Sequence, residues 1–239
     1  MNTTYNKCSL LDDFDVLDQR INKNIILDWI KANFIEYEGL NISDKPNKDG
    51  LYEANAGYLQ LHPNSKSITN GMFVWKNVTG DFSCYYCTSL TSLEGSPKEV
   101  GRSFNCIGCK SLISLEGAPE EVGRYFYCQY CDSLKALEGA PKEVGGNFDC
   151  YCCNSLISLK GAPKEVGGNF NCSYCNSLTS LEGAPEEVGG SFDCSYCNSL
   201  TSLKGAPEEV GGSFDCRNCK YLTSYELPST TKIKGEIIR

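Results

Sequence analysis

The residues with the clearest chemical potential in this chain are its cysteines, which number 16 in 239 residues. Seven Cys-x-x-Cys pairs contain 14 of them, and each pair begins 22 residues after the preceding one. Cys8 and Cys152 stand outside these pairs. Cysteine pairs at this spacing can hold zinc, form disulfides or perform thiol redox chemistry. The paired residues are Cys84, Cys87, Cys106, Cys109, Cys128, Cys131, Cys150, Cys153, Cys172, Cys175, Cys194, Cys197, Cys216 and Cys219.

The cysteines belong to a longer repeat, because columns of Phe, Leu, Val, Pro and Gly keep the same 22-residue step. A Phe precedes the first Cys of every pair by two residues, from Phe82 to Phe214, and no insertion breaks the register. A unit this short cannot bury a core alone, whereas identical stacked units can. Phe-x-Cys alternates like a strand with one face inward. The sequence therefore predicts a repeat solenoid of stacked parallel β-strands with turn or short helical connections, plus a small α-containing N-terminal cap.

The repeat also sets the expected boundaries. Leu59-Gln-Leu61 lies one slightly long step before Phe82-Ser-Cys84 and is interpreted as a degenerate first rung. Upstream, apolar spacing predicts one helical stretch from Leu10 to Ile21, and a second helix that Asn24 caps and that runs to about Phe34. The predicted parts are an N-terminal helical or irregular cap over 1–58, a solenoid over 59–224 with the degenerate rung at 59–80 and seven rungs from about 81, and a C-terminal cap over 225–239.

The first part of one rung reads Phe-Asp-Cys-Ser-Tyr-Cys-Asn-Ser-Leu-Thr-Ser-Leu from Phe192 to Leu203. This pattern resembles the core of leucine-rich repeats, Leu-x-Leu-x-x-Asn/Cys-x-x-Leu, with the second Cys at the Asn/Cys ladder position. Cys-x-Ser-Leu-Thr-Ser-Leu is also similar to bacterial surface repeats of the BspA type, and Glu-Gly-Ala-Pro-x-Glu-Val-Gly-Gly to repeats of tailed-phage proteins. The resemblance covers about residues 59–228, departs from the family by using Phe and Cys where aliphatics are usual, and implies a leucine-rich-repeat-like solenoid without a catalytic residue.

Three observations favour a core of reduced thiols over a metal site. The pairs recur in step with Phe and Leu, an odd number of pairs cannot all form four-Cys sites between two rungs, and both Cys columns match positions that the similar repeats bury. A thioredoxin-like pair also needs a helix start, and no helical pattern follows these motifs. We therefore expect no cofactor. Zinc bound by the 14 paired cysteines, or thiol redox chemistry, remains the alternative.

The remaining sequence argues against an enzyme. His62 is the single histidine and, beside Pro63 in the degenerate rung, indicates a surface or cap position. No phosphate-binding loop, dinucleotide fingerprint or HExxH motif occurs, and acidic pairs such as Glu120-Glu121 share their column with lysines, as solvated turn residues do. The net charge of −8 argues against nucleic acid. With neither a signal sequence nor a membrane-spanning apolar stretch, we expect a cytoplasmic protein.

Two glycine columns carry separate expectations. The column that starts at Gly101 is invariant among full rungs, and we expect it to need a backbone angle that only glycine adopts easily. The next column contains Arg102 and Arg124 as well as glycines, so we expect ordinary backbone angles there.

If Phe82 and Cys84 point inward, the residues beside them point outward, and these outward columns vary from rung to rung. Tyrosines cluster in the early rungs, and tyrosine is favoured in interfaces. We expect a protein-interaction scaffold that binds a partner on this strand face. The alternatives are merely solvated strand residues there, or a surface or virion-associated adhesin. The candidate binding residues are Tyr85, Asn105, Tyr125, Tyr127, Asp149, Tyr151, Asn171, Asp193, Asp215 and Arg217.

Overall fold

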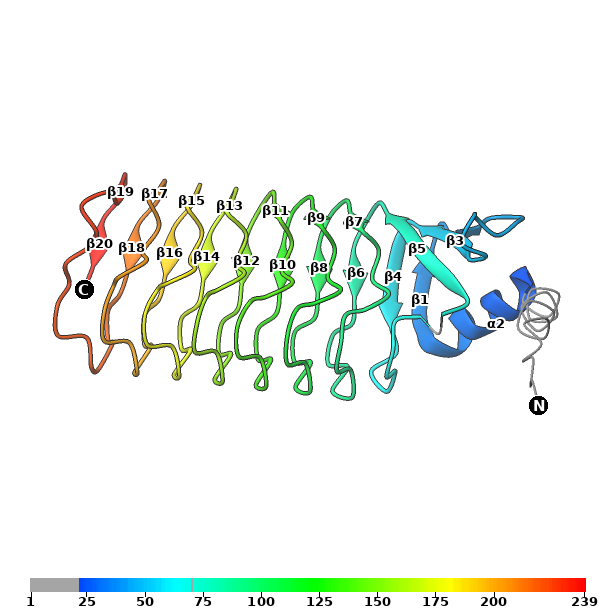
Figure 1. Ribbon diagram of the computed structural model, residues 1–239, viewed down its shortest axis with the longest axis horizontal. Coiled ribbons are helices and arrows are strands. Elements are labelled where there is room, and N and C mark those ends of the chain that lie inside the picture. The colour runs from blue at the N-terminus through cyan, green and yellow to red at the C-terminus, as the bar shows by residue number, and fades with distance from the viewer. Residues whose placement is uncertain (1–21, 70) are drawn as a thin grey trace, which may run out of the picture.

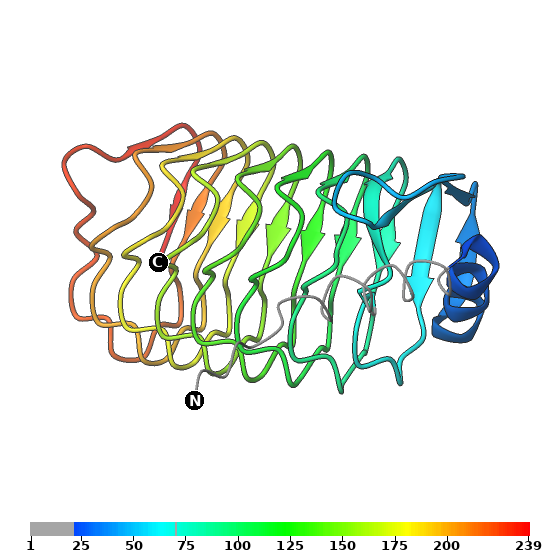
Figure 2. The same ribbon diagram turned by 45° about the vertical axis from the view of Figure 1, so that its right-hand side comes forward.

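Two long sheets, each of ten strands, run side by side along the whole molecule (Figures 1 and 2). The computed structural model describes residues 22–69 and 71–239. Successive turns of the chain stack as coils, and each coil of the repeat gives one short strand to each sheet. This confirms the predicted β-solenoid. Rungs 1 to 7 are named here by their first residues, which are Phe82, Phe104, Phe126, Phe148, Phe170, Phe192 and Phe214.

Sheet A is built from the Phe-x-Cys segments. In every rung the Phe is fully buried, and neighbouring Phe residues pair in parallel register, as Phe126 does with Phe148. The repeat strands are β6 (Phe82–Ser83), β8 (Phe104–Asn105), β10 (Phe126–Tyr127), β12 (Phe148–Asp149), β14 (Phe170–Asn171), β16 (Phe192–Asp193), β18 (Phe214–Asp215) and β20 (Ile237–Ile238).

Sheet B is formed by the Glu-Val segments, which the sequence analysis assigned only to a turn region. Each Val points into the core and is at most 2% exposed, while the preceding Glu faces outward. The stack therefore has two sheets around one core. The strands are β7 (Glu99–Val100), β9 (Glu121–Val122), β11 (Glu143–Val144), β13 (Glu165–Val166), β15 (Glu187–Val188), β17 (Glu209–Val210) and β19 (Lys232–Ile233).

The core consists of stacked columns of identical side chains. Phe rings of adjacent rungs lie nearly parallel, with centroids 5.1–5.3 Å apart from Phe82 to Phe214. Both Cys columns and both Leu columns are buried beside them. Burying one such side chain contributes about 1.5–3 kcal/mol, so each rung is held by its contacts with its two neighbours.

The N-terminal segment closes one end of the stack (Figure 1). Helix α2 (Lys23–Asn33) packs Ile26 and Ile30 into the core, and Asn22 caps it by accepting the backbone N–H groups of residues 24 and 25. The cap is therefore Asn22, and the prediction that Asn24 caps this helix was wrong. The earlier predicted stretch, 10–21, lies outside the described residues. None of the helices within the described ranges is long and apolar enough to cross a membrane.

Five longer or irregular strands join this helix to the repeat. One antiparallel partner ends each sheet, β1 beside β4 in sheet A and β2 beside β3 in sheet B. Strand β4 pairs in parallel with β6 and aligns Leu59 with Phe82, the column position that begins rung 1. The strands are β1 (Phe34–Glu38), β2 (Asn41–Ile42), β3 (Tyr52–Ala56), β4 (Tyr58–Leu61) and β5 (Phe73–Val78).

At the other end, the segment 225–239 supplies β19 and β20. These strands extend both sheets in parallel, with Ile233 next to Val210 and Ile237 next to Phe214. The last segment thus continues the column positions with aliphatic residues.

The invariant glycine column is needed for a reason other than the predicted one. Gly123 has no left-handed backbone angle, but a Cβ on it would overlap the carbonyl oxygen of Gly101 in the rung before, and the same overlap recurs along the column. Left-handed angles occur instead in the column of Gly95, with φ between 83° and 89°. As predicted, Gly146 has no left-handed angle.

Candidate binding surfaces

The paired thiols form two hydrogen-bonded ladders inside the solenoid. The second thiol of a rung donates to the carbonyl oxygen of the first Cys in the preceding rung, for example Cys153 Sγ to Cys128 O at 3.0 Å and Cys175 Sγ to Cys150 O at 3.2 Å. Several first thiols donate in the opposite direction, as Cys150 does to Asn171 O at 3.3 Å. All paired cysteines are buried and free of disulfides. The thiols thus tie each rung to both neighbours.

This arrangement stabilises the protonated thiol. Burial raises the pKa of Cys87 and of Cys150 to about 12, and it raises the pKa of Cys84 well above its ordinary value. Zinc needs thiolates that converge on one point. Within residues 22–69 and 71–239, no group of three or more potential ligands converges in this way. The donor geometry therefore fits a packed thiol core better than zinc ligation.

Sheet A presents the predicted binding residues on its outer face, with unequal exposure. Tyr85, Tyr125 and Arg217 are exposed, whereas Asp215 is buried and forms an ion pair with Arg217 at 2.7 Å. The half-buried members are Asn105, Tyr127, Asp149, Tyr151, Asn171 and Asp193.

The Asn and Asp residues of this face hold its backbone turns. Asp149 Oδ1 accepts the N–H of Tyr151 at 2.9 Å, and Asp193 Oδ1 accepts that of Ser195 at 2.9 Å. Asn105, Asn171 and Asp215 make the same bond two residues ahead. Such Asx turns account for the residue types in this column without a ligand. The tyrosines are consequently the members whose chemistry the fold does not explain.

A second column of tyrosines was not predicted from the sequence. It occupies the third residue of Cys-x-x-Cys, where every rung has a left-handed backbone angle between 55° and 70°. Bulky residues rarely adopt this conformation, which costs about 1–2 kcal/mol per residue. Glycine and asparagine tolerate this angle, so the presence of Gly108 and Asn218 in the column was the feature of the sequence that could have indicated it. The column consists of Tyr86, Gly108, Tyr130, Cys152, Tyr174, Tyr196 and Asn218.

These tyrosines form a continuous stack over rungs 3 to 6. In rung 4, where Cys152 replaces the tyrosine, the neighbouring Tyr151 fills the gap, with ring centroids 5.4 Å from Tyr130 and 5.3 Å from Tyr174. Tyr174 in turn stacks on Tyr196 at 4.4 Å. A hydrogen bond with the Cys152 side chain raises the pKa of the Tyr151 phenol. Cys152 is half-buried and so more accessible than the paired cysteines, which are all buried.

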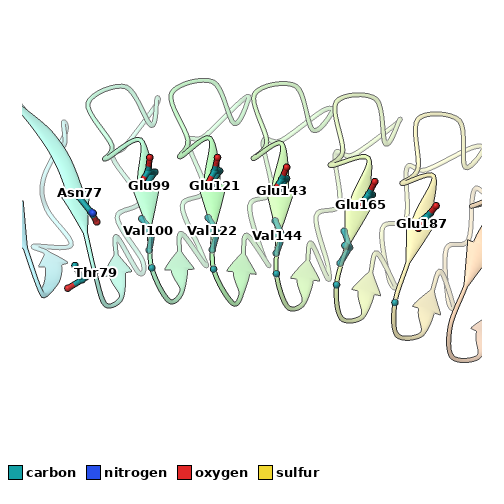
Figure 3. A pocket seen from close by; sticks show the side chains of 16 residues that line it. Asn77, Thr79, Glu99, Val100, Glu121, Val122, Glu143, Val144, Glu165 and Glu187 are labelled. Atoms are coloured by element: carbon teal, nitrogen blue, oxygen red, sulfur yellow. The ribbon is translucent and has the colours of Figure 1, made fainter.

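Sheet B carries a groove of about 740 Å³ on its outer face (Figure 3). Its floor is the backbone of the Val and Gly columns, and a row of glutamates stands along it. Lysines near the groove form ion pairs with glutamates that stand one position before the row in the sequence, as Lys142 Nζ does with Glu120 Oε2 at 2.7 Å. Among the described residues, none of the glutamates in the row has an ion pair. The row consists of Glu99, Glu121, Glu143, Glu165 and Glu187.

Comparison with protein-family models, with curated proteins and with solved structures gave no match. The binding surfaces are therefore interpreted from their own geometry.

Proposed function

We propose that this protein is a non-enzymatic scaffold that binds a protein partner on the outer face of sheet A. The observation that carries the proposal is the contrast between the invariant buried columns and the exposed tyrosines Tyr85 and Tyr125, which flank the short strands β6 and β10. Tyrosine offers a large rigid contact area with a polar tip, at a small cost in ordering entropy. Because the register of β6 to β12 fixes these side chains, the face would already have its bound conformation before the partner arrives.

The composition of this face supports a protein partner. Tyr125 and Tyr127 lie together with ring centroids 5.7 Å apart, and Ser103, Asn105 and Gln129 surround them in neighbouring positions. Rigid tyrosines among small polar residues are typical of surfaces that bind folded proteins. The acidic chain shows no basic stripe of the kind that nucleic acid requires.

The finer identity belongs to the same proposal. The rung motif and the thiol ladder support kinship with leucine-rich repeats, including BspA-type and phage-encoded ones, although the second sheet gives each coil two strands. We also propose a cytoplasmic location, where thiols such as Cys84 and Cys106 stay reduced. Zinc binding is not proposed further, because the thiols donate to carbonyls.

The test replaces Tyr125 by Ser and Tyr127 by Asn, which are the residues of the preceding rung at these positions. Wild type and variant, each labelled, are used to capture partners from the native host for mass spectrometry, and the binding of each recovered protein is then measured after purification. We expect the variant to keep the wild-type melting temperature and to lose the partner. A control, Ser191→Asn in a later rung, should bind normally. Retained binding by the tyrosine variant would reject this face.

A further inference from the structure

The side of the solenoid that follows the left-handed tyrosine column is unlike the rest of this acidic protein. In rungs 4 to 6 it comprises residues 152–158, 174–180 and 196–202, which we call the neutral face. The last two segments are identical, Tyr-Cys-Asn-Ser-Leu-Thr-Ser, and none of the three contains a charged residue. The chain as a whole carries a net charge of −8. The neutral face is thus a charge-free and repeated surface.

The second cysteine of each pair and the Leu residues of these segments are buried, so the tyrosine, Asn, Ser and Thr positions make most of the surface. The Asn side chains form a row in which Asn198 Nδ2 donates to Asn176 Oδ1 at 2.9 Å and Asn176 Nδ2 donates to Asn154 Oδ1 at 3.1 Å. These bonds fix the orientation of the Asn176 and Asn198 amides, while Asn154 Nδ2 donates to Asp132 Oδ1 at 3.4 Å and to Cys152 O at 3.3 Å. A fixed polar group loses little entropy when it binds a ligand.

Apolar groups stand between these polar rows. The column of Thr179 and Thr201 continues in rung 4 with Ile157, whose side chain is 55% exposed. On the other flank lies the tyrosine stack that ends in Tyr174 and Tyr196. Four tyrosines of this column keep a left-handed angle that glycine adopts without cost, as Gly108 does. Strain that recurs at one position points to a function of the tyrosine side chain.

We propose that the neutral face of rungs 4 to 6 binds an uncharged linear polysaccharide. Such a polymer presents hydroxyl groups and apolar ring faces at a constant repeat. The neutral face presents amides, hydroxyls, methyl groups and aromatic rings that recur at the strand spacing of about 4.8 Å. A folded protein without stacked repeats does not present the same residue types at such a constant spacing. A polyanion would need cations, and the Asn column has none in rungs 4 to 6; it continues with Asp132 in rung 3 and with Lys220 in rung 7.

This proposal goes beyond the protein scaffold and uses a different surface. Tyr125 and Tyr127 lie on the outer face of sheet A, whereas Asn176 and Asn198 lie beyond the buried second cysteines of their rungs. The two proposals can therefore fail separately.

The experiment measures cosedimentation of the full chain with insoluble cellulose, chitin, xylan and mannan, with heparin beads and immobilised poly(dT) as charged controls. We expect binding to at least one neutral polysaccharide and none to the charged polymers. Two variants use residues that other rungs already have at these positions: Tyr174→Gly/Tyr196→Gly after Gly108, and Asn176→Lys/Asn198→Lys after Lys110.

Each variant is expected to weaken binding at least tenfold while its melting temperature stays close to that of the wild type. Because the variants alter different columns, misfolding of one leaves the other as a test. Glu165→Gln/Glu187→Gln in the groove of sheet B should bind like the wild type. The proposal is overturned if the wild type sediments with none of the neutral polysaccharides, if it binds the charged polymers equally, or if a folded variant binds undiminished.

Discussion

Replacing Gly145 by Ala tests the close approach of neighbouring rungs in sheet B. The new Cβ would overlap the carbonyl oxygen of Gly123, so rungs 2 and 3 must separate locally or the carbonyl must turn. Either movement disturbs the hydrogen bond from Gly145 N–H to Val122 O, now 2.9 Å long. Overpacking of this kind costs about 1–3 kcal/mol. Ala recovers about 0.4–1 kcal/mol by restricting the unfolded chain.

The net loss is therefore about 1–2 kcal/mol, which at this chain length lowers the melting temperature by about 2–8 °C. Differential scanning calorimetry measures the shift. The matched control is Gly57→Ala, whose Cβ would meet the Glu38 carbonyl at an ordinary 3.4 Å, and which should be neutral or slightly stabilising. If Gly145→Ala melts at the wild-type temperature, or if both variants are destabilised equally, the close-approach argument is wrong.

Three further substitutions probe the core and its charges. Phe148→Ala removes a ring stacked between two others and should cost about 3–5 kcal/mol in denaturant unfolding, and a loss below 1 kcal/mol would contradict the ladder. Burial raises the pKa of the Asp149 carboxyl above 3.8, so the charged carboxylate is less stable in the folded protein, and the stability of the wild type falls as pH rises through the raised pKa. Asp149→Asn should therefore stabilise the protein at pH 7, with an advantage that fades towards pH 3. Melting temperatures measured across this pH range will show the change. Glu143 stands between like charges in register, so Glu143→Gln should raise the melting temperature at low salt and leave it unchanged at about 1 M salt, where the screening length is about 3 Å; equal shifts at both salt concentrations would refute this repulsion.

The columns of the core were predictable because their period coincides with their burial. Phe104, Cys106 and Leu112 recur in step, and a residue type that never varies in a stack of identical coils must face the shared interior. The same logic predicts a degenerate rung from Leu59, where aliphatic residues replace the Phe and Cys.

The second sheet could not be read from the sequence in the same way. Its strands within the repeat contain two residues each, such as Glu121–Val122, and they lie between a Pro-containing turn and a glycine. The pairing arises only when identical coils stack. Likewise, the invariant Gly123 column could reflect a special angle or a close approach, and only the distance between rungs separates these causes.

The binding surface was the least predictable part. An outward position in a varied column suggests a side chain that is available for binding a partner. The side chains of Asn105 and Asp193 instead accept hydrogen bonds from backbone N–H groups of their own turns. The left-handed tyrosines were hidden because Tyr130 and Tyr174 are unusual in that conformation, although Gly108 shares their column. Neither fact follows from period alone, since both depend on local backbone angles.

In this interpretation the paired cysteines are protonated core residues of a rigid stack, and only the surfaces of the stack bind other molecules. The most direct measurement is thiol titration in a Cys8→Ser variant, native and denatured, together with metal analysis. The native protein should show one fast-reacting thiol, Cys152, and the denatured protein all 15 that the structure shows as free. Zinc present in stoichiometric amount, or several fast thiols in the native state, would contradict the account.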